Sequence, residues 1–289
     1  MDYRTFLPHP LLRPYIVNYW SLSSDIAGLA PEESCIVPDG NTSLMFIDEI
    51  LYRRRPQQAQ ASRHLRQCLL IGQKSQPVFY SFPPGQTIET FGVRFRPLGL
   101  DRFIKVPMHQ LSDLTVEAER LFGPAINSLY QRLLEQKDLS SVRFFLDKFF
   151  LGRLERPTEK YGLAQQLVGQ ILRQKGQVKI ADLTSRSAVS ARQADRLFRH
   201  FLGLSPKHFA RIIRFNHCIY EYNRKSFDKL TDLAYANGYF DQMHFIKEVK
   251  SFTLKTPGHF FNVPSRMGDA LQQVLTERFE TNRQNSRTV

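Results

Sequence analysis

The chain has few cysteines, no long hydrophobic run and no leader-like start. Its three cysteines, Cys35, Cys68 and Cys218, are far apart and odd in number, which favours reduced thiols over a disulfide framework or a zinc knuckle. No stretch of the 289 residues is long and apolar enough for a transmembrane helix. The N-terminus, MDYRTFLPHP, holds no basic segment followed by an apolar run, so we expect no signal peptide. Together these features predict a cytoplasmic protein without a membrane partner.

Patterns that mark catalytic and metal sites are missing as well. The histidines of the N-terminal half are His9, His64 and His109, and no two of them form a closely spaced metal-binding pair. The chain also contains no Gly-x-Ser-x-Gly sequence and no glycine-rich phosphate-binding loop. We therefore expect no catalytic residue, no metal and no cofactor.

Positive charge is abundant and unevenly placed. The formal net charge is +13. Residues 1–157 hold 19 Lys and Arg against 16 Asp and Glu, whereas residues 158–289 hold 21 against 11, a net charge of +10 for the second half. A strongly basic half joined to a nearly neutral one predicts that only the second half binds a polyanion.

Short stretches rich in β-branched and aromatic residues follow one another through the first half. Turn residues such as Pro38-Asp39-Gly40-Asn41 separate them. This pattern predicts a small β-barrel or a double sheet. The expected strands cover residues 11–22, 42–50, 69–72, 78–82 and 90–95.

Beyond residue 98 the spacing of apolar residues becomes helical, and two longer helices are expected over 116–134 and 140–154. Their short connection makes them antiparallel neighbours. The helices carry more apolar surface than a pair needs, mainly from Phe144, Phe145, Phe149 and Phe150. We therefore expect the pair either to cover its own barrel or to meet the same pair of a second chain in a homodimer.

Two arginines are candidate ligand-binding residues in the first half. Arg94 and Arg96 alternate along an expected strand, so they share one face of it. Inside a barrel they could contact an anionic ligand. The alternative is that both are solvated or salt-bridged arginines.

The second half contains helical stretches that tight turns separate. Amphipathic helices are expected over 161–173, 179–186, 191–202 and 206–222. A further helix ends at Asn237-Gly238, and the next begins near Asp241, a plausible N-cap. Two pairs of these helices are joined by a short turn with a bend, so the pattern predicts two helix-turn-helix units.

Each unit presents a candidate DNA-reading face. In the first unit Arg192, Asp195, Arg196 and Arg199 lie three and four residues apart on one helix face. Arginine can pair with guanine through two hydrogen bonds, and aspartate can accept one from cytosine. In the second unit the outward residues are Gln242, Met243, Ile246 and Lys247. Glutamine can read adenine, whereas methionine and isoleucine can only pack against a thymine methyl or a sugar.

Both units carry a recognisable motif. The first reads Ser190-x-Arg192-x3-Arg196-x-Phe198-x4-Gly203-x-Ser205-Pro206. The second reads Ala234-x3-Gly238-Tyr239-x-Asp241-Gln242-x-His244-Phe245, followed by Lys250 and Thr256-Pro257. Together they resemble the AraC/XylS family of bacterial transcription regulators. The resemblance assigns base contacts to Arg192, Asp195 and Arg196, and to Gln242, Met243, Ile246 and Lys247.

The chain departs from the family pattern at several positions. The family has Gly where Ala188 and Leu254 stand, and Phe where Tyr239 stands. In the first unit it favours Ala and Leu where Thr184 and Ser187 stand. Polar residues at core positions cost stability unless they find hydrogen bonds, so we expect this unit to pack more loosely.

A second resemblance covers most of the first half. Pro14-Tyr15-x3-Tyr19-Trp20, Pro38-Asp39-Gly40 and the run from Gly92 to Pro97 are similar to an uncharacterised domain found ahead of AraC-type DNA-binding domains. In the family such domains are cupin-like barrels with dimerisation helices.

The two resemblances imply an α+β fold in three parts. Residues 1–157 form a cupin-like β-barrel with following helices, for sensing or dimerisation. Residues 158–265 form an all-α DNA-binding domain with two helix-turn-helix units. Residues 266–289 form a C-terminal helix and tail.

The function implied is sequence-specific binding of double-stranded promoter DNA under the control of a small-molecule effector at the N-terminal domain. RNA polymerase is a further partner implied by the family. Two alternatives remain at this point: a cupin-like small-molecule enzyme fused to a DNA-binding domain, and an architectural DNA protein whose barrel interior is filled by its own side chains.

Overall fold

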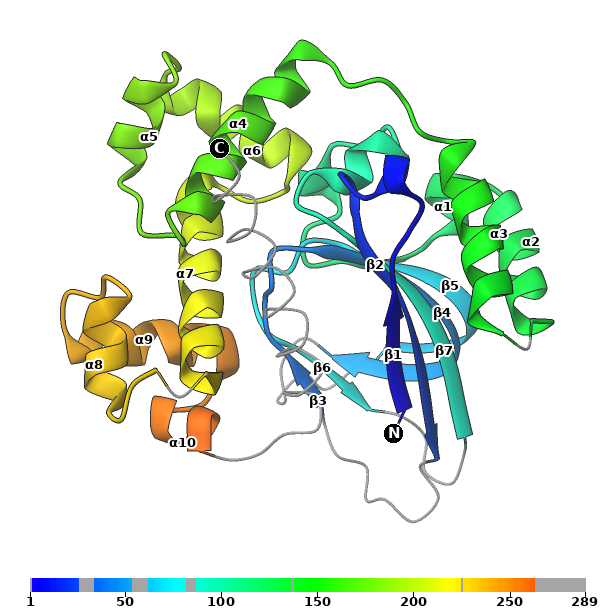
Figure 1. Ribbon diagram of the computed structural model, residues 1–289, viewed down its shortest axis with the longest axis horizontal. Helices are drawn as coiled ribbons and strands as arrows, with labels where there is room; N and C mark the ends of the chain where they lie inside the picture. Colours follow the sequence, from blue (N-terminus) through cyan, green and yellow to red (C-terminus); the bar gives the residue numbers. More distant parts are fainter. Residues whose placement is uncertain are drawn as a thin grey trace.

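The computed structural model describes residues 2–25, 34–53, 62–81, 87–136, 138–224 and 226–262. An antiparallel sheet comes first, helices follow it, and the C-terminal region is helical (Figure 1). This order confirms the expected α+β class. The C-terminal helix and tail expected over 266–289 lie outside the described residues. Within the described part of the chain, no helix is long and apolar enough to cross a membrane.

The described strands form one antiparallel sheet. Its order is β1-β2-β7-β4-β5-β8, with β6 pairing to both β4 and β3. The outermost strands of this path, β1 and β8, do not pair with each other, so the sheet is not closed into the expected cupin-like barrel. Closure fails because β5 gives its outer edge to the short β8, which leads directly into helix α1. The strands are β1 (Asp2–Phe6), β2 (Ile16–Asp25), β3 (Ser34–Ile36), β4 (Thr42–Arg53), β5 (Ser62–Ile71), β6 (Val78–Ser81), β7 (Thr87–Phe95) and β8 (Thr115–Glu117).

Alternate residues of the central strands give the sheet two different faces. Tyr19, Leu44 and Phe95 lie on one face and are fully buried with the helices that follow the sheet. Trp20 and Met45 lie on the other face, in a smaller apolar cluster. This separation follows from the two-residue period of a strand.

Three helices cover the first of these faces: α1 (Glu119–Phe122), α2 (Ala125–Leu134) and α3 (Leu139–Leu151). Asp138 begins α3 by accepting a hydrogen bond from the Ser141 amide. Phe149 and Phe150 are buried in this core, whereas the side chain of Phe144 is 60% exposed. The helix pair therefore covers its own sheet, and most of its phenylalanine surface is used there. Short 3-10 helices complete the region: η1 (Pro10–Leu12), η2 (Gly99–Arg102) and η3 (Met108–Gln110).

The C-terminal region contains two helix-turn-helix units joined by a long helix (Figure 1). Its helices are α4 (Glu159–Arg173), α5 (Ile180–Arg186), α6 (Ala191–Phe201), α7 (Pro206–Asn223), α8 (Leu230–Ala236), α9 (Gln242–Thr253) and α10 (Pro257–Asn262). The first unit is α5 with α6, and the second is α8 with α9. Ser190, Ser205 and Asp241 cap α6, α7 and α9 by accepting backbone N–H groups. The expected helices and their start signals are present.

The N-terminal region packs directly on the first helix-turn-helix unit. Val37 and Leu98 belong to the same buried cluster as the core of the C-terminal helices. The Ser112 hydroxyl donates a 2.7 Å hydrogen bond to the Gly203 carbonyl, at the turn between α6 and α7. The Nε2 atom of His208 on α7 lies 3.2 Å from the Ser75 carbonyl oxygen. These contacts fix the position of the sheet region beside α6.

Candidate nucleic-acid interface

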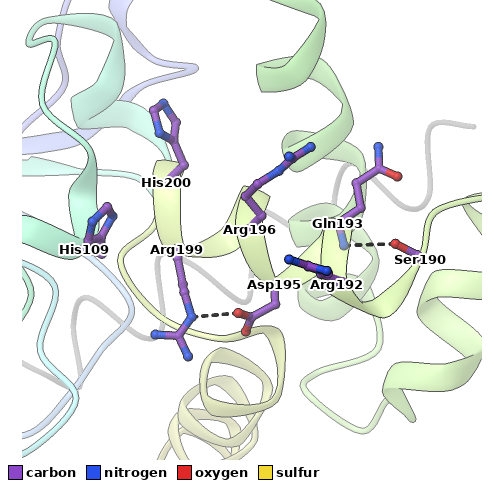
Figure 2. A pocket seen from close by; sticks show the side chains of 8 residues that line it. All are labelled: His109, Ser190, Arg192, Gln193, Asp195, Arg196, Arg199 and His200. Atoms are coloured by element: carbon purple, nitrogen blue, oxygen red, sulfur yellow. Dashed lines mark hydrogen bonds and ion pairs between the residues drawn. The ribbon is translucent and has the colours of Figure 1, made fainter.

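Helix α6 exposes the basic face that its sequence predicts. Leu197 and Phe198 point into the core, so Arg192, Arg196 and Arg199 are left on the surface. Asp195 lies between them, and its Oδ2 atom accepts a 2.7 Å hydrogen bond from Arg199 Nε (Figure 2). Because that pair occupies the only acid of the face, Arg192 and Arg196 make no ion pair with another described residue. Two guanidinium groups thus remain available to a partner.

A groove of about 640 Å³ runs along this face. One wall is α6, and the other includes His109 of η3 in the N-terminal region (Figure 2). Burial lowers the pKa of His200, and the positive charges of His109 and Lys160 lower it further. The groove is lined by His109, Ser190, Arg192, Gln193, Asp195, Arg196, Arg199 and His200.

Helix α9 presents a less polar reading face. Gln242, Met243 and Lys247 are exposed, and Ile246 is half-buried. The Met243 side chain is 57% exposed, although it has no group that hydrogen-bonds to a base edge. Phe240, just before the helix, is 87% exposed. The sequence signal for this exposed aromatic ring was its position in the turn directly ahead of the N-cap residue Asp241.

A buried carboxylate attaches α9 to the connecting helix α7. Glu248 Oε1 accepts hydrogen bonds from Arg214 Nη2 at 2.9 Å and from the Tyr239 hydroxyl at 2.8 Å. Its Oε2 atom accepts a 2.8 Å hydrogen bond from Arg211. Burial, together with the nearby Cys218 and Glu248, raises the pKa of Tyr239, so its hydroxyl keeps the proton that it donates.

Sequence reasoning missed Glu248 as a positioning residue for the second reading face. The signal was its place among apolar residues on the inner side of α9, because a buried acid requires a cationic partner. The presence of Tyr in place of the family's Phe at 239 was a second signal, because the added hydroxyl needs an acceptor.

The structure does not bring Arg94 and Arg96 together. Strand β7 ends at Phe95, so Arg96 lies beyond it and donates to the Arg13 carbonyl at 2.8 Å. The Arg94 side chain is 17% exposed and lies 4.0 Å from Asp39. Of the two expected ligand-binding residues, only Arg94 therefore reaches the interior.

Buried polar groups gather around Arg94. Asp39 pairs with Lys74 at 3.3 Å, and both side chains are 5% exposed. Arg94 Nε and Nη1, Gln73 Nε2 and Trp20 Nε1 are buried donors without an acceptor among the described residues. Trp20 lies over Gly92 in the neighbouring strand, two residues from Arg94, which places both side chains on one face of the sheet. This arrangement suits a ligand rich in acceptor atoms.

Within the described ranges, no group of three or more His, Cys, Asp or Glu side chains is placed to hold a metal ion. Cys68 and Cys218 are both buried and free, and burial raises the pKa of each thiol above its usual value.

Each half of the chain contains a segment that matches a known protein family. Residues 183–262 match the family described as a helix-turn-helix domain, and residues 4–117 match a domain of unknown function, DUF6597. No curated protein matches the chain in sequence.

Several solved structures of ToxT from Vibrio cholerae resemble the fold at low identity. One in the P21 crystal form has 11% identity and a TM-score of 0.49, and it covers 84% of this chain and 98% of its own. Another, described as bound to an unsaturated fatty acid, has 13% identity and a TM-score of 0.47, with 86% and 98% covered.

The matched segment of the C-terminal half includes α6, α7, α8, α9 and α10 and both reading faces. Residues 183–262 of this chain are therefore a helix-turn-helix domain of the AraC type, carried behind an N-terminal domain of unknown function.

Proposed function

We propose that this protein is a transcription regulator of the bacterial cytoplasm that binds promoter DNA in a sequence-specific way. The observation that carries the proposal is the face of α6, where Arg192 and Arg196 are exposed and make no ion pair with another described residue. The AraC-type domain and the net charge of +10 in the second half support the same function. The protein acts by binding and performs no catalytic step.

Both units take part in the proposed complex. Helices α6 and α9 enter successive major grooves, which are about 34 Å apart along the duplex. On α6, Arg192, Asp195 and Arg196 read base edges, and Arg199 belongs to the same DNA-binding face. On α9, Gln242 reads adenine, Met243 and Ile246 pack on apolar groups, and Lys247 holds a phosphate.

Arg196→Ala is expected to weaken binding to the cognate duplex by about 1–3 kcal/mol and to relax preference at one base position, because a bidentate arginine–guanine pair is lost.

Lys247→Ala is expected to weaken binding equally on cognate and scrambled DNA and to lower the salt slope by about one unit, as loss of a phosphate contact does. Titrating each variant against both duplexes at several salt concentrations measures these effects.

Arg120→Ala is the matched control, because it removes the same charge from an exposed position of the N-terminal region. It should leave DNA binding unchanged. If Arg196→Ala preserves the ratio of cognate to scrambled affinity while Lys247→Ala collapses it, then α9 and not α6 reads the sequence. Binding of the unsubstituted chain that does not respond to salt would contradict the proposed function itself.

We further propose that a small anionic effector binds the N-terminal domain and changes DNA binding. The buried donors of Arg94, Gln73 and Trp20 support this, since Arg94 Nε, Gln73 Nε2 and Trp20 Nε1 make no hydrogen bond and Arg94 Nη1 has only its 4.0 Å ion pair with Asp39. The apolar cluster that contains Trp20 and Met45 lies on the same face of the sheet, so the effector carries an apolar part beside its anionic group. RNA polymerase, and a second copy of the chain in a homodimer, are the further partners of the proposed regulator.

A further inference from the structure

The N-terminal region holds His109 beside the reading face of α6. Ser112 donates to the Gly203 carbonyl at the end of α6, and a Cβ atom added to Gly203 would lie 2.9 Å from the Met108 carbonyl oxygen. The backbone of η3 is thus in close contact with the turn that follows α6. His109, the middle residue of η3, is exposed and lines the same groove as Arg196 and Arg199 (Figure 2).

Hydrogen-bond donors line this groove from two elements. His109 comes from η3, and Arg192, Arg196, Arg199 and His200 come from α6. The one acid that lines it, Asp195, is already paired with Arg199. A contact that served only to hold the two regions together would place an acid opposite these donors. The groove instead keeps a surplus of donors on both walls, which an anion would neutralise.

We infer that the DNA interface continues from α6 onto the N-terminal domain, where His109 contacts a phosphodiester group of the bound duplex. The inference rests on the proposed function and extends its footprint. A helix in the major groove has phosphates on either side of it, and those contacts position the protein without reading sequence. The groove is continuous with Arg192 and Arg196, so the strand that flanks their base contacts reaches His109.

The imidazole ring of His109 carries an N–H group that donates to a phosphate oxygen. The charged and titratable groups that line the groove with it are His200, Arg192, Arg196, Arg199 and Asp195 on α6. Lys160 on α4 acts on His200.

The experiment compares His109→Ala with Gln110→Ala in the full chain. Gln110 is the neighbouring exposed residue of η3 and does not line the groove, so it is the matched control. Affinity for the cognate duplex is measured over a range of salt concentrations. We expect His109→Ala to weaken binding several-fold, as loss of a phosphate contact does, and Gln110→Ala to match the unsubstituted chain.

Each other result is decisive. If His109→Ala leaves affinity and salt slope unchanged while DNA binding persists, the extended footprint is wrong and the proposed function stands. If His109→Ala binds DNA more tightly, η3 obstructs α6 and the inference is overturned. If inorganic phosphate at constant ionic strength shifts the ring resonances of His109 in an NMR experiment but the duplex does not, the groove binds a small anion and not DNA. If the unsubstituted chain binds no duplex, both proposals fail together.

Discussion

At the scale of single residues, two turns keep a conformation that their side chains disfavour. Ala188 has φ 52° and Leu254 has φ 59°, both in the left-handed region. These are the two positions where the family pattern has glycine. A residue other than glycine pays about 1–2 kcal/mol to adopt this conformation. Each helix-turn-helix unit therefore contains one strained residue, at the turn of the first unit and at the end of α9 in the second.

Ala188→Gly is expected to raise the free energy of unfolding by about 0.5–1 kcal/mol, since the strain that it relieves exceeds the added entropy of the unfolded chain, about 0.4–1 kcal/mol. Leu254→Gly should act in the same direction, because the leucine side chain is 47% exposed and little packing is lost. Denaturant unfolding measures both. The matched control is Ala181→Gly in the exposed part of α5, which should be destabilising. Equal destabilisation by Ala188→Gly and Ala181→Gly would show that the turn is not strained.

Two polar residues at core positions of the first unit find hydrogen-bond partners in the structure. The hydroxyl of Thr184 donates within α5, lying 3.0 Å from the carbonyl oxygens of both Ile180 and Ala181. The hydroxyl of Ser187 accepts a 2.9 Å hydrogen bond from Gln170 Nε2 on α4. Satisfied polar groups cost little when they are buried. The residue types alone indicate that these hydroxyls need hydrogen bonds, whereas the partners become known only from the structure.

At the scale of elements, the docking of α9 on α7 depends on one carboxylate. Glu248 is 1% exposed in its side chain and meets Arg214, which is 14% exposed, and Arg211, which is 34% exposed. The guanidinium of Arg214 also lies over the Tyr239 ring, 4.4 Å from its centre. Removing one partner of a buried ion pair leaves the other charge uncompensated. The angle between the two units therefore depends on this network.

Glu248→Gln is expected to lower the free energy of unfolding by about 3 kcal/mol, at the lower end of the range for broken buried pairs because Arg211 is partly solvated. Tyr239→Phe, which restores the family's residue, removes one hydrogen bond and should cost about 1 kcal/mol. Glu117→Gln breaks an exposed pair with Arg120 and serves as the control, with a cost near about 0–1 kcal/mol. Urea unfolding compares the three. A cost for Glu248→Gln no larger than that of the control would refute this account of how α9 is held.

At the scale of the whole molecule, a short loop connects the polar interior of the sheet region to α7. Asp39 pairs with Lys74 inside the N-terminal region. The next residue, Gly40, has φ 76°, and a Cβ atom added there would lie 3.0 Å from Phe209 on α7. A ligand that competes with Asp39 for Arg94 would act on this loop. The proposed effector site is thus in physical contact with α7, the helix that joins the two helix-turn-helix units.

Arg94→Gln is expected to abolish effector binding, because it removes the cationic donor that faces the interior. The measurement is the thermal shift of the full chain with a panel of small apolar carboxylates. Arg96→Gln is the matched control, since Arg96 bonds to the Arg13 carbonyl away from the interior. Carboxylates that stabilise the unsubstituted chain should stabilise the control equally and leave Arg94→Gln unchanged. Equal shifts in both variants, or none with any carboxylate, would contradict the proposed site.

Local patterns predicted much of the fold and of the candidate interface. Capping residues such as Ser190 and Asp241 mark helix starts wherever they occur, and the helical spacing of Arg192 and Arg196 places them on one face regardless of context. Signals of this kind lie within a few residues of each other, so the sequence by itself determined the α+β class, both helix-turn-helix units and the outward residues of α6 and α9.

Contacts between distant segments were decided only by the tertiary structure. Whether the sheet closes depends on which strand takes the outer edge of β5, and no local pattern specifies that β8 does so. The same holds for the pairing of Glu248 with Arg214, and for the approach of His109 to α6. Each of these contacts joins residues that are far apart in the chain. Which residues meet there depends on the packing of many side chains at once. Local sequence therefore set the helices and their reading faces, whereas long-range packing set the open sheet, the docking of α9 and the wall that the N-terminal domain adds to the groove.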